Sequence, residues 1–342
     1  MNAKHWLLAM AAATLLFPLA CPCWAQSKVI PVGHVRELQA YLDAVEIYAP
    51  IRCRNLAVYP VRLRGGTTLG GSWLTMDEAL RRGELIVSEQ RGGGRVPVVS
   101  MENRSRSHHI FIMAGEILAG GKQTRTLRQD VVLSPGERIN VKVFCVEEHR
   151  WRGDEKFMAG ESLVPQSIHK QLRKGADQAS IWDEVSRNNR ALGAENATGS
   201  LLLALKSEKV ARELSDIRSQ IMPEVPRDAV GFVFLHGRQA VAAEFFGRPE
   251  VARVLLPKLV DAYAVDFVLQ QKGRAPVHPS PDNVAIRFFQ QVQRSRSHHV
   301  DTPGSGSGIQ TRTRSLIGEG VSLAERLVHY GVQIEDRVLP LR

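Results

Sequence analysis

The sequence predicts an α+β fold, and the order of its apolar patterns carries that prediction. Short extended runs dominate residues 50–155, helical periodicity takes over across 160–225, and both patterns return over 228–340. Runs of strands followed by runs of helices are typical of α+β proteins, whereas regular alternation is typical of α/β proteins. We therefore expect a β-rich N-terminal half, central helices and a C-terminal hairpin-plus-helix layer, all within one integrated unit.

Composition excludes several other classes of protein. The 342 residues include 45 Lys or Arg and 35 Asp or Glu, which gives a net charge of +10, and 44% of the residues are hydrophobic. These values exclude a disordered chain, a collagen-like repeat and a small disulfide scaffold. A basic chain suits nucleic acid as a partner, but only 6% of the residues are aromatic and no nucleic-acid-binding motif occurs. We expect no nucleic-acid partner.

The N-terminus has the pattern of a signal peptide. Lys4 precedes an apolar stretch over residues 6–20, and Cys23-Trp24-Ala25 then resembles a cleavage site. We expect residues 1–25 to be removed on export to the periplasm. Lipid anchoring at Cys21 is the alternative. No later apolar run reaches the ~18 residues needed to span a bilayer, so we expect no transmembrane segment after cleavage.

An amphipathic helix is predicted in the lead-in over residues 26–49, because its apolar side chains recur three and four positions apart. Short strands are predicted after it, at residues 56–59, 85–87, 98–101 and 110–113. Thr75 and Glu78 form a capping box that opens a short helix, and Gly83 closes it. Strict alternation of apolar and polar residues over 139–145 predicts another strand.

The second half of the chain mixes helices and strands. The elements predicted there are helices around Trp182 and over 202–217, a β-hairpin over 230–243, a helix from Pro249 to Phe267, a helix opened by Ser280-Pro281, and strands at 316–317 and 327–334. The Gly- and Ser-rich segment 301–308 predicts a flexible linker or an exposed loop.

Two further patterns have structural and functional interpretations. Arg-Ser-Arg-Ser-His-His occurs at 104–109 and again at 294–299. Since no Asp, Glu or Cys lies at a ligand spacing nearby, we predict solvated loops and no metal site.

Cys53 and Cys145 remain after signal removal, and they either pair or are buried as free thiols. We favour buried thiols.

The first candidate site is the segment from Gly115 to Arg125. An acid, an amine, an amide and a guanidinium, namely Glu116, Lys122, Gln123 and Arg125, fall within ten residues among three glycines. The cations suit a phosphate or carboxylate, and Glu116 suits a ribose contact or an acid–base role if burial raises its pKa. In the alternative, these charges pair with one another inside a buried turn.

The second candidate site follows the alternating strand. Glu147, Arg150 and Trp151 lie where that strand ends, which is a common place for functional groups. Trp151 suits stacking on a ring and Arg150 suits an anion, while Glu147 is the second catalytic candidate beside Glu116. In the alternative, Trp151 belongs to the hydrophobic core.

The same segments resemble a known family. The most specific matches are Gly115-Glu116-x-Leu118-x-Gly120-Gly121-Lys122-Gln123-x-Arg125 and Cys145-Val146-Glu147-x-x-Arg150-Trp151. Together with matches elsewhere over residues 50–335, they resemble the ARG and Rhodanese-Phosphatase-superfamily-associated Protein domain family. At position 124 that family usually has Asn, and here it is Thr.

The resemblance implies a link to ADP-ribosylglycohydrolases through genome context, and so to phosphorylated or ADP-ribose-like small molecules. We therefore hold two hypotheses. In the first, both segments converge on one concave site that binds or processes such an anion, without a cofactor. In the second, the chain is a non-catalytic binding or envelope-associated module, and the same polar residues lock two β segments together.

Overall fold

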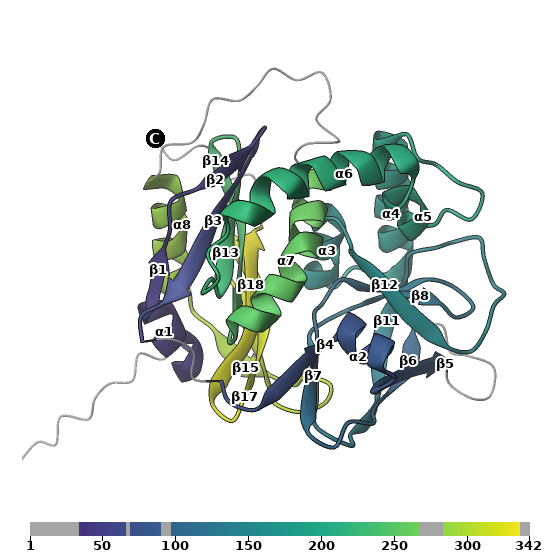
Figure 1. The fold of residues 1–342 in the computed structure, drawn as a ribbon, viewed down its shortest axis with the longest axis horizontal. Helices are drawn as coiled ribbons and strands as arrows, with labels where there is room; N and C mark the ends of the chain where they lie inside the picture. The colour runs from purple at the N-terminus through teal and green to yellow at the C-terminus, as the bar shows by residue number, and fades with distance from the viewer. Residues whose placement is uncertain (1–33, 66–68, 90–96, 267–282, 336–342) are drawn as a thin grey trace, which may run out of the picture. The chain divides into compact units, whose positions relative to one another are not determined.

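The largest sheet of the computed structural model has nine strands, and all of its pairs are antiparallel (Figure 1). The structure describes residues 34–65, 69–89, 97–266 and 283–335. Eight strands follow one another across the sheet in the order β1 (Val45–Ile47), β3 (Leu56–Leu63), β13 (Gly231–His236), β14 (Gln239–Phe246), β18 (Arg326–Ile334), β17 (Leu316–Leu323), β16 (Ser307–Arg312) and β15 (His298–Val300). The ninth strand, β2 (Ile51–Cys53), also pairs with β3.

Helices cover both faces of this sheet. On one face lie α1 (Arg36–Asp43) and α8 (Asn283–Gln293), and on the other lies α7 (Pro249–Ala264) (Figure 1). Each face of the sheet packs into a separate hydrophobic core, and alternate side chains of β13 belong to the two cores. Phe232 belongs to the core under α7, and Val233 belongs to the core under α1 and α8. The core under α7 also includes residues of α3 (Gln166–Lys174), α4 (Gln178–Leu192), α5 (Leu201–Leu205) and α6 (Glu208–Ile221), which a short 3₁₀ turn (Met222–Glu224) follows.

A second sheet carries the two candidate segments. Its six strands run in the order β12 (Phe157–Leu163), β8 (Glu116–Gly120), β9 (Arg125–Leu127), β11 (Arg138–Cys145), β6 (Val98–Asn103) and β5 (Leu85–Glu89). Its two edge strands meet, because the N–H of Glu89 donates to the carbonyl oxygen of Glu155 at 2.9 Å and Ser88 bridges Lys156. The sheet thus curves round a third core, to which Met101, Leu118 and Val141 belong.

A small third sheet completes the strands. It consists of β10 (Val131–Leu133), β7 (His108–Ile112) and β4 (Ser72–Thr75), and β4 runs directly into α2 (Met76–Arg82). The capping box predicted at the start of α2 is confirmed, because the backbone N–H of Thr75 donates to Glu78 Oε2 at 3.0 Å. Gly83 ends the helix in the left-handed conformation, with φ of 68°.

The predicted α+β class is confirmed, with strands and helices grouped as the apolar patterns indicate. The alternating strand over 139–145 is β11, and the predicted hairpin is β13 with β14. Cys53 and Cys145 are both buried and free, which confirms the preferred interpretation.

Two loop predictions are wrong in part. The segment 301–308 is not a flexible linker, since the N–H of Ser305 donates to the carbonyl oxygen of Val132 at 2.8 Å and β16 already begins at Ser307. Residues 104–107 and 294–297 of the two repeats lie in loops as predicted, but the histidine pairs that follow begin strands β7 and β15. Short polar segments of this kind are ordered here by tertiary hydrogen bonds that local composition does not reveal.

The predicted signal peptide over residues 1–25, Cys21 as a lipid site and the Ser280-Pro281 helix start lie outside the described residues. Among the helices that are described, none combines the length and the apolar character required to cross a bilayer.

Candidate functional site

The segment from residue 115 to 125 forms a tight hairpin between β8 and β9. Gly120 and Gly121, at its turn, have positive φ angles of 91° and 55°. A Cβ on Gly121 would overlap the ring of Phe157 on β12. Only glycine fits both this backbone conformation and this close approach. The turn glycines therefore serve packing against β12.

The end of β11 lies directly against this turn. Gln123 Nε2 donates to the carbonyl oxygens of Glu147 and Glu148 at 2.8 Å and 3.1 Å. The Arg150 guanidinium donates to the carbonyl oxygen of Gly121 at 2.9 Å. Six residues singled out from the sequence thus form one group, which we call the Trp151 cluster: Lys122, Gln123, Arg125, Glu147, Arg150 and Trp151.

The negative charge of Glu147 is balanced by hydrogen bonds and an ion pair inside the Trp151 cluster. Arg150 Nη2 lies 2.7 Å from Glu147 Oε2, and the backbone N–H and the hydroxyl of Thr124 donate to the same oxygen at 3.0 Å and 2.8 Å. Burial alone would raise the pKa of Glu147, but these hydrogen bonds outweigh it and hold the pKa below its usual value. Thr124 thus holds Glu147 through both its backbone and its side chain.

Arg125 is completely buried and links three partners. Its Nη1 donates to Gln123 Oε1 at 2.9 Å and also contacts Cys145 Sγ, and its Nη2 lies 3.5 Å from Glu89 Oε1. Burial raises the pKa of Cys145 to about 11, although Arg125 acts in the opposite direction. The Cys145 thiol is therefore protonated at neutral pH and is unsuited to act as a nucleophile.

Trp151 and Lys122 form the outer part of the Trp151 cluster. The Trp151 side chain is 49% exposed, so it is not a core residue. Lys122 Nζ lies 5.4 Å from the centroid of its ring and Arg125 Cζ lies 5.7 Å from it, both within cation–π range. In the described part of the chain, no carboxylate pairs with the Lys122 ammonium. An open indole therefore lies beside a cation without a counter-ion.

Glu116 lies outside the Trp151 cluster. Its Oε1 accepts from Lys258 Nζ of α7, which also donates to Asp77 Oδ2 of α2 at 2.8 Å. Its Oε2 accepts from the backbone N–H of Met113 at 2.8 Å. Burial raises the pKa of Glu116 and Lys258 opposes this effect. These contacts tie α2, α7 and β8 together through one buried ion triad.

Lys258 and Asp77 lie in segments that resemble the family, but sequence reasoning did not include them among the candidate site residues. A signal was present for Lys258, because it interrupts an apolar run of α7 between Leu255 and Val260 and is buried with that run. A lysine at such a position needs a buried counter-ion. The sequence does not show which of its 35 carboxylates supplies it.

A second buried polar network also escaped sequence reasoning. His329 Nδ1 lies 2.6 Å from Asp130 Oδ2, and His329 Nε2 lies 3.2 Å from Glu244 Oε2. The other oxygen of Glu244 accepts from Tyr263 at 3.0 Å and lies 3.4 Å from Arg173 Nη2. These side chains come from five separate elements or loops, so no local pattern predicts their meeting.

Electrostatics within this network favour charged groups. Burial lowers the pKa of His329, but Asp130 and Glu244 outweigh it and raise the pKa to about 9. Burial likewise opposes the effect of Arg173 and His329 on Glu244, whose pKa falls to about 2. Gly331 is essential to the fit, because a Cβ there would overlap both Arg173 Nη2 and Glu244 Oε2. The network is a densely packed internal ion cluster.

Within the described residues, no group of three or more His, Cys, Asp or Glu side chains is arranged to hold a metal ion. The buried carboxylates instead have lysine, arginine or histidine as partners, as in the ion triad and the His329 network. The chemistry of these donors matches internal charge pairing.

Comparison with known proteins agrees with the resemblance found in the sequence. No curated protein matches the chain. A solved structure of a provisionally assigned thioesterase II from Thermobifida fusca YX aligns over 89% of this chain and 97% of its own, at 14% identity. Its TM-score is 0.13, so this likeness supports no conclusion about fold or function. The family model matches residues 44–332, and the chain belongs to the ARG and Rhodanese-Phosphatase-superfamily-associated Protein domain family.

Proposed function

We propose that this chain is an exported, non-catalytic binding domain for a phosphorylated small molecule that carries a ring, of the nucleotide or ADP-ribose type. The observation that carries the proposal is the half-exposed Trp151 indole with the Lys122 ammonium 5.4 Å from its ring centroid. An indole face stacks on a base, and an ammonium pairs with a phosphate. Export rests on the N-terminal sequence pattern alone.

Contacts of the residues on either side of Trp151 hold its loop in place. Arg150 donates to the carbonyl oxygens of Gly120, Gly121 and Arg152, at 3.2, 2.9 and 2.7 Å. Gly153 packs so closely on the Gly121 carbonyl oxygen that a Cβ would overlap it. A preorganised surface loses less conformational entropy on binding, so a small contact area yields more affinity.

Binding without reaction is favoured by the state of the two glutamates considered for catalysis. Glu116 is held by Lys258 within a different group of residues, and Glu147 is held by Arg150 and Thr124. A general acid or base must reach the substrate through a hydrogen bond. In this proposal both carboxylates position other groups, and Lys122 and Trp151 contact the ligand.

A thermal-shift experiment on the purified protein tests the proposal. ADP-ribose and ADP should each raise the apparent stability, by about 2.7 kcal/mol at a concentration a hundred times Kd. Adenosine and orthophosphate should each have a much smaller effect, because each offers only one of the two contacts. No shift with any of these compounds at millimolar concentration would leave the Trp151 cluster with a purely structural role.

Two variants assign the binding to the cluster. Trp151→Ala should weaken ADP-ribose binding about thirtyfold, because the middle of the range for stacking of a base on an aromatic side chain is about 2 kcal/mol. Lys122→Met should weaken ADP more than adenosine, because it removes only the charge contact. Lys142→Met, an exposed lysine on β11, is the matched control. Equal weakening by Lys142→Met would show that general charge, and not this site, attracts the ligand.

A further inference from the structure

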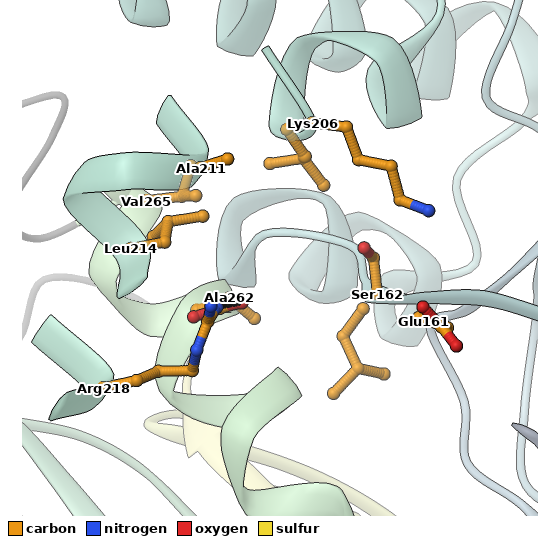
Figure 2. Close-up of a pocket in the computed structure, with 11 residues that line it drawn as sticks. Glu161, Ser162, Lys206, Ala211, Leu214, Arg218, Ala262 and Val265 are labelled. Atoms are coloured by element: carbon orange, nitrogen blue, oxygen red, sulfur yellow. Dashed lines mark hydrogen bonds and ion pairs between the residues drawn. The ribbon is translucent and has the colours of Figure 1, made fainter. Parts of the chain in front are cut away.

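A cleft separate from the Trp151 cluster opens between β12, α7 and the α5–α6 pair (Figure 2). Its volume is about 380 Å³, within the range typical of small-molecule sites. Apolar side chains form much of its lining, namely Leu163, Leu205, Ala211, Leu214, Ala262 and Val265. It shares no residue with the Trp151 cluster.

Charged and hydroxyl side chains of the cleft lie at two places. Lys206 and Ser162 lie on one side of the cleft, with the Lys206 side chain along its edge, and Arg218 lies on the other side (Figure 2). Arg218 forms an ion pair with Asp261, and Glu161 forms one with Arg81 at 3.1 Å.

Lys206 and Ser162 differ from these paired groups. Within the described residues, neither the Lys206 ammonium nor the Ser162 hydroxyl has a hydrogen-bond or ion-pair partner. Lys206 is exposed and Ser162 is half-buried. The edge of the cleft therefore carries an ammonium without an ion-pair partner, next to an available hydroxyl.

A bulge in β12 brings Ser162 to this place. The pairing of β12 with β8 shifts register between Ala159 and Leu163, and Glu161 has a φ of 55°, which is rare for a residue other than glycine. Such bulges re-aim side chains and recur next to functional sites. Strained backbone persists where the surrounding structure enforces it, and it clusters at binding and active sites.

From this geometry we infer a second binding site, for a small carboxylate with an apolar tail, such as a medium-chain fatty acid. The carboxylate pairs with Lys206 and accepts a hydrogen bond from Ser162, and the tail lies along the leucines. A single unpaired ammonium favours a monoanion over a phosphate dianion. The other two cations nearby, Arg81 and Arg218, already form ion pairs with Glu161 and Asp261.

Titration of the purified full chain with hexanoate, octanoate and 1-octanol, followed by ligand-observed NMR, tests this inference. Each buried methylene contributes about 0.8 kcal/mol, so affinity should rise about fourfold per added methylene from hexanoate to octanoate. Octanol lacks the charge and should bind more weakly than octanoate. An affinity that does not depend on chain length, or equal binding of octanol, would overturn the proposal.

Variants place the ligand in the cleft. Lys206→Met should weaken octanoate binding about fivefold, the upper end for a partly exposed ion pair. Ala211→Phe fills the cleft and should abolish binding. Lys209→Met, an exposed lysine on the same helix pair but outside the cleft, should have no effect.

The outcomes of these variants also separate the two proposed sites. Unchanged binding in both Lys206→Met and Ala211→Phe, in proteins that retain their folded circular dichroism spectrum, would refute the site. Trp151→Ala should leave octanoate binding intact, so this proposal and the nucleotide proposal fail or survive independently.

Discussion

The stability of this protein should fall as pH rises above neutrality, because His329 is held in its charged form inside the fold. Its pKa is raised from 6.5 to about 9 by Asp130 and Glu244, against the effect of burial. A raised folded-state pKa adds stability that is fully present below pH 6.5 and is lost as pH rises through about 9. The sign is therefore opposite to that of a histidine buried in its neutral form.

The expected size follows from the two pKa values. The interval between 6.5 and about 9 corresponds to about 3 kcal/mol in total. About 2 kcal/mol of this should be lost between pH 7 and pH 8.5. The pH range of the measurement starts at pH 7 because burial lowers the pKa values of His109 and His169. At lower pH these two histidines change the free energy of unfolding in the opposite direction to His329. The range ends at 8.5 because thiols of the unfolded chain ionise above that value.

Urea denaturation at several pH values measures this dependence. The free energy of unfolding of the natural protein should fall across this pH range. That of His329→Gln, whose side chain keeps polar atoms but does not titrate, should fall by much less, with a small remaining loss from Asp266, whose pKa burial raises to about 7. The difference between the two slopes isolates His329 from every other group. An identical decline in the variant, or a flat profile in the natural protein, would refute a charged His329.

Three further predictions concern buried groups. Lys258→Met should lower the free energy of unfolding by about 3–5 kcal/mol, because it leaves two buried carboxylates without their counter-ion. A loss below about 1 kcal/mol in urea denaturation would contradict the ion triad. Gly331→Ala should cost about 2–3 kcal/mol through overlap with the His329 network, while Gly70→Ala, with open space around it, should be near neutral in the same assay. Cys145 should resist a thiol reagent in the native protein and react after denaturation, and rapid native labelling located by mass spectrometry would contradict its burial.

Local patterns predicted the elements of this fold well. The Thr75–Glu78 capping box, the alternation in β11 and the turn of the β13–β14 hairpin each depend on residues a few positions apart. Such signals can be interpreted from one sequence because the interacting groups are neighbours in the chain. The same reasoning failed for segment 301–308, whose order comes from Val132, more than 150 residues away.

The sequence predicted most residues of the candidate site but not which residues pair with one another. Sequence reasoning selected Glu116 and Arg125 as one group, and the structure places them in different groups, one with Lys258 and the other with Gln123 and Glu89. Charge pairing in the interior depends on which strands and helices become neighbours, and residue order alone does not give that arrangement. Trp151 is exposed in a loop that Arg150 links to Gly121, and the sequence does not show that link.

NMR of the tryptophan indole N–H groups tests the binding proposal most directly. Trp73, Trp151 and Trp182 lie in the described part of the chain, and the signal missing from Trp151→Phe identifies Trp151. Addition of ADP-ribose should shift the Trp151 signal and leave those of the other two in place. Saturating shifts at Trp73 or Trp182 with an unmoved Trp151 would contradict a ligand site at the Lys122–Trp151 surface.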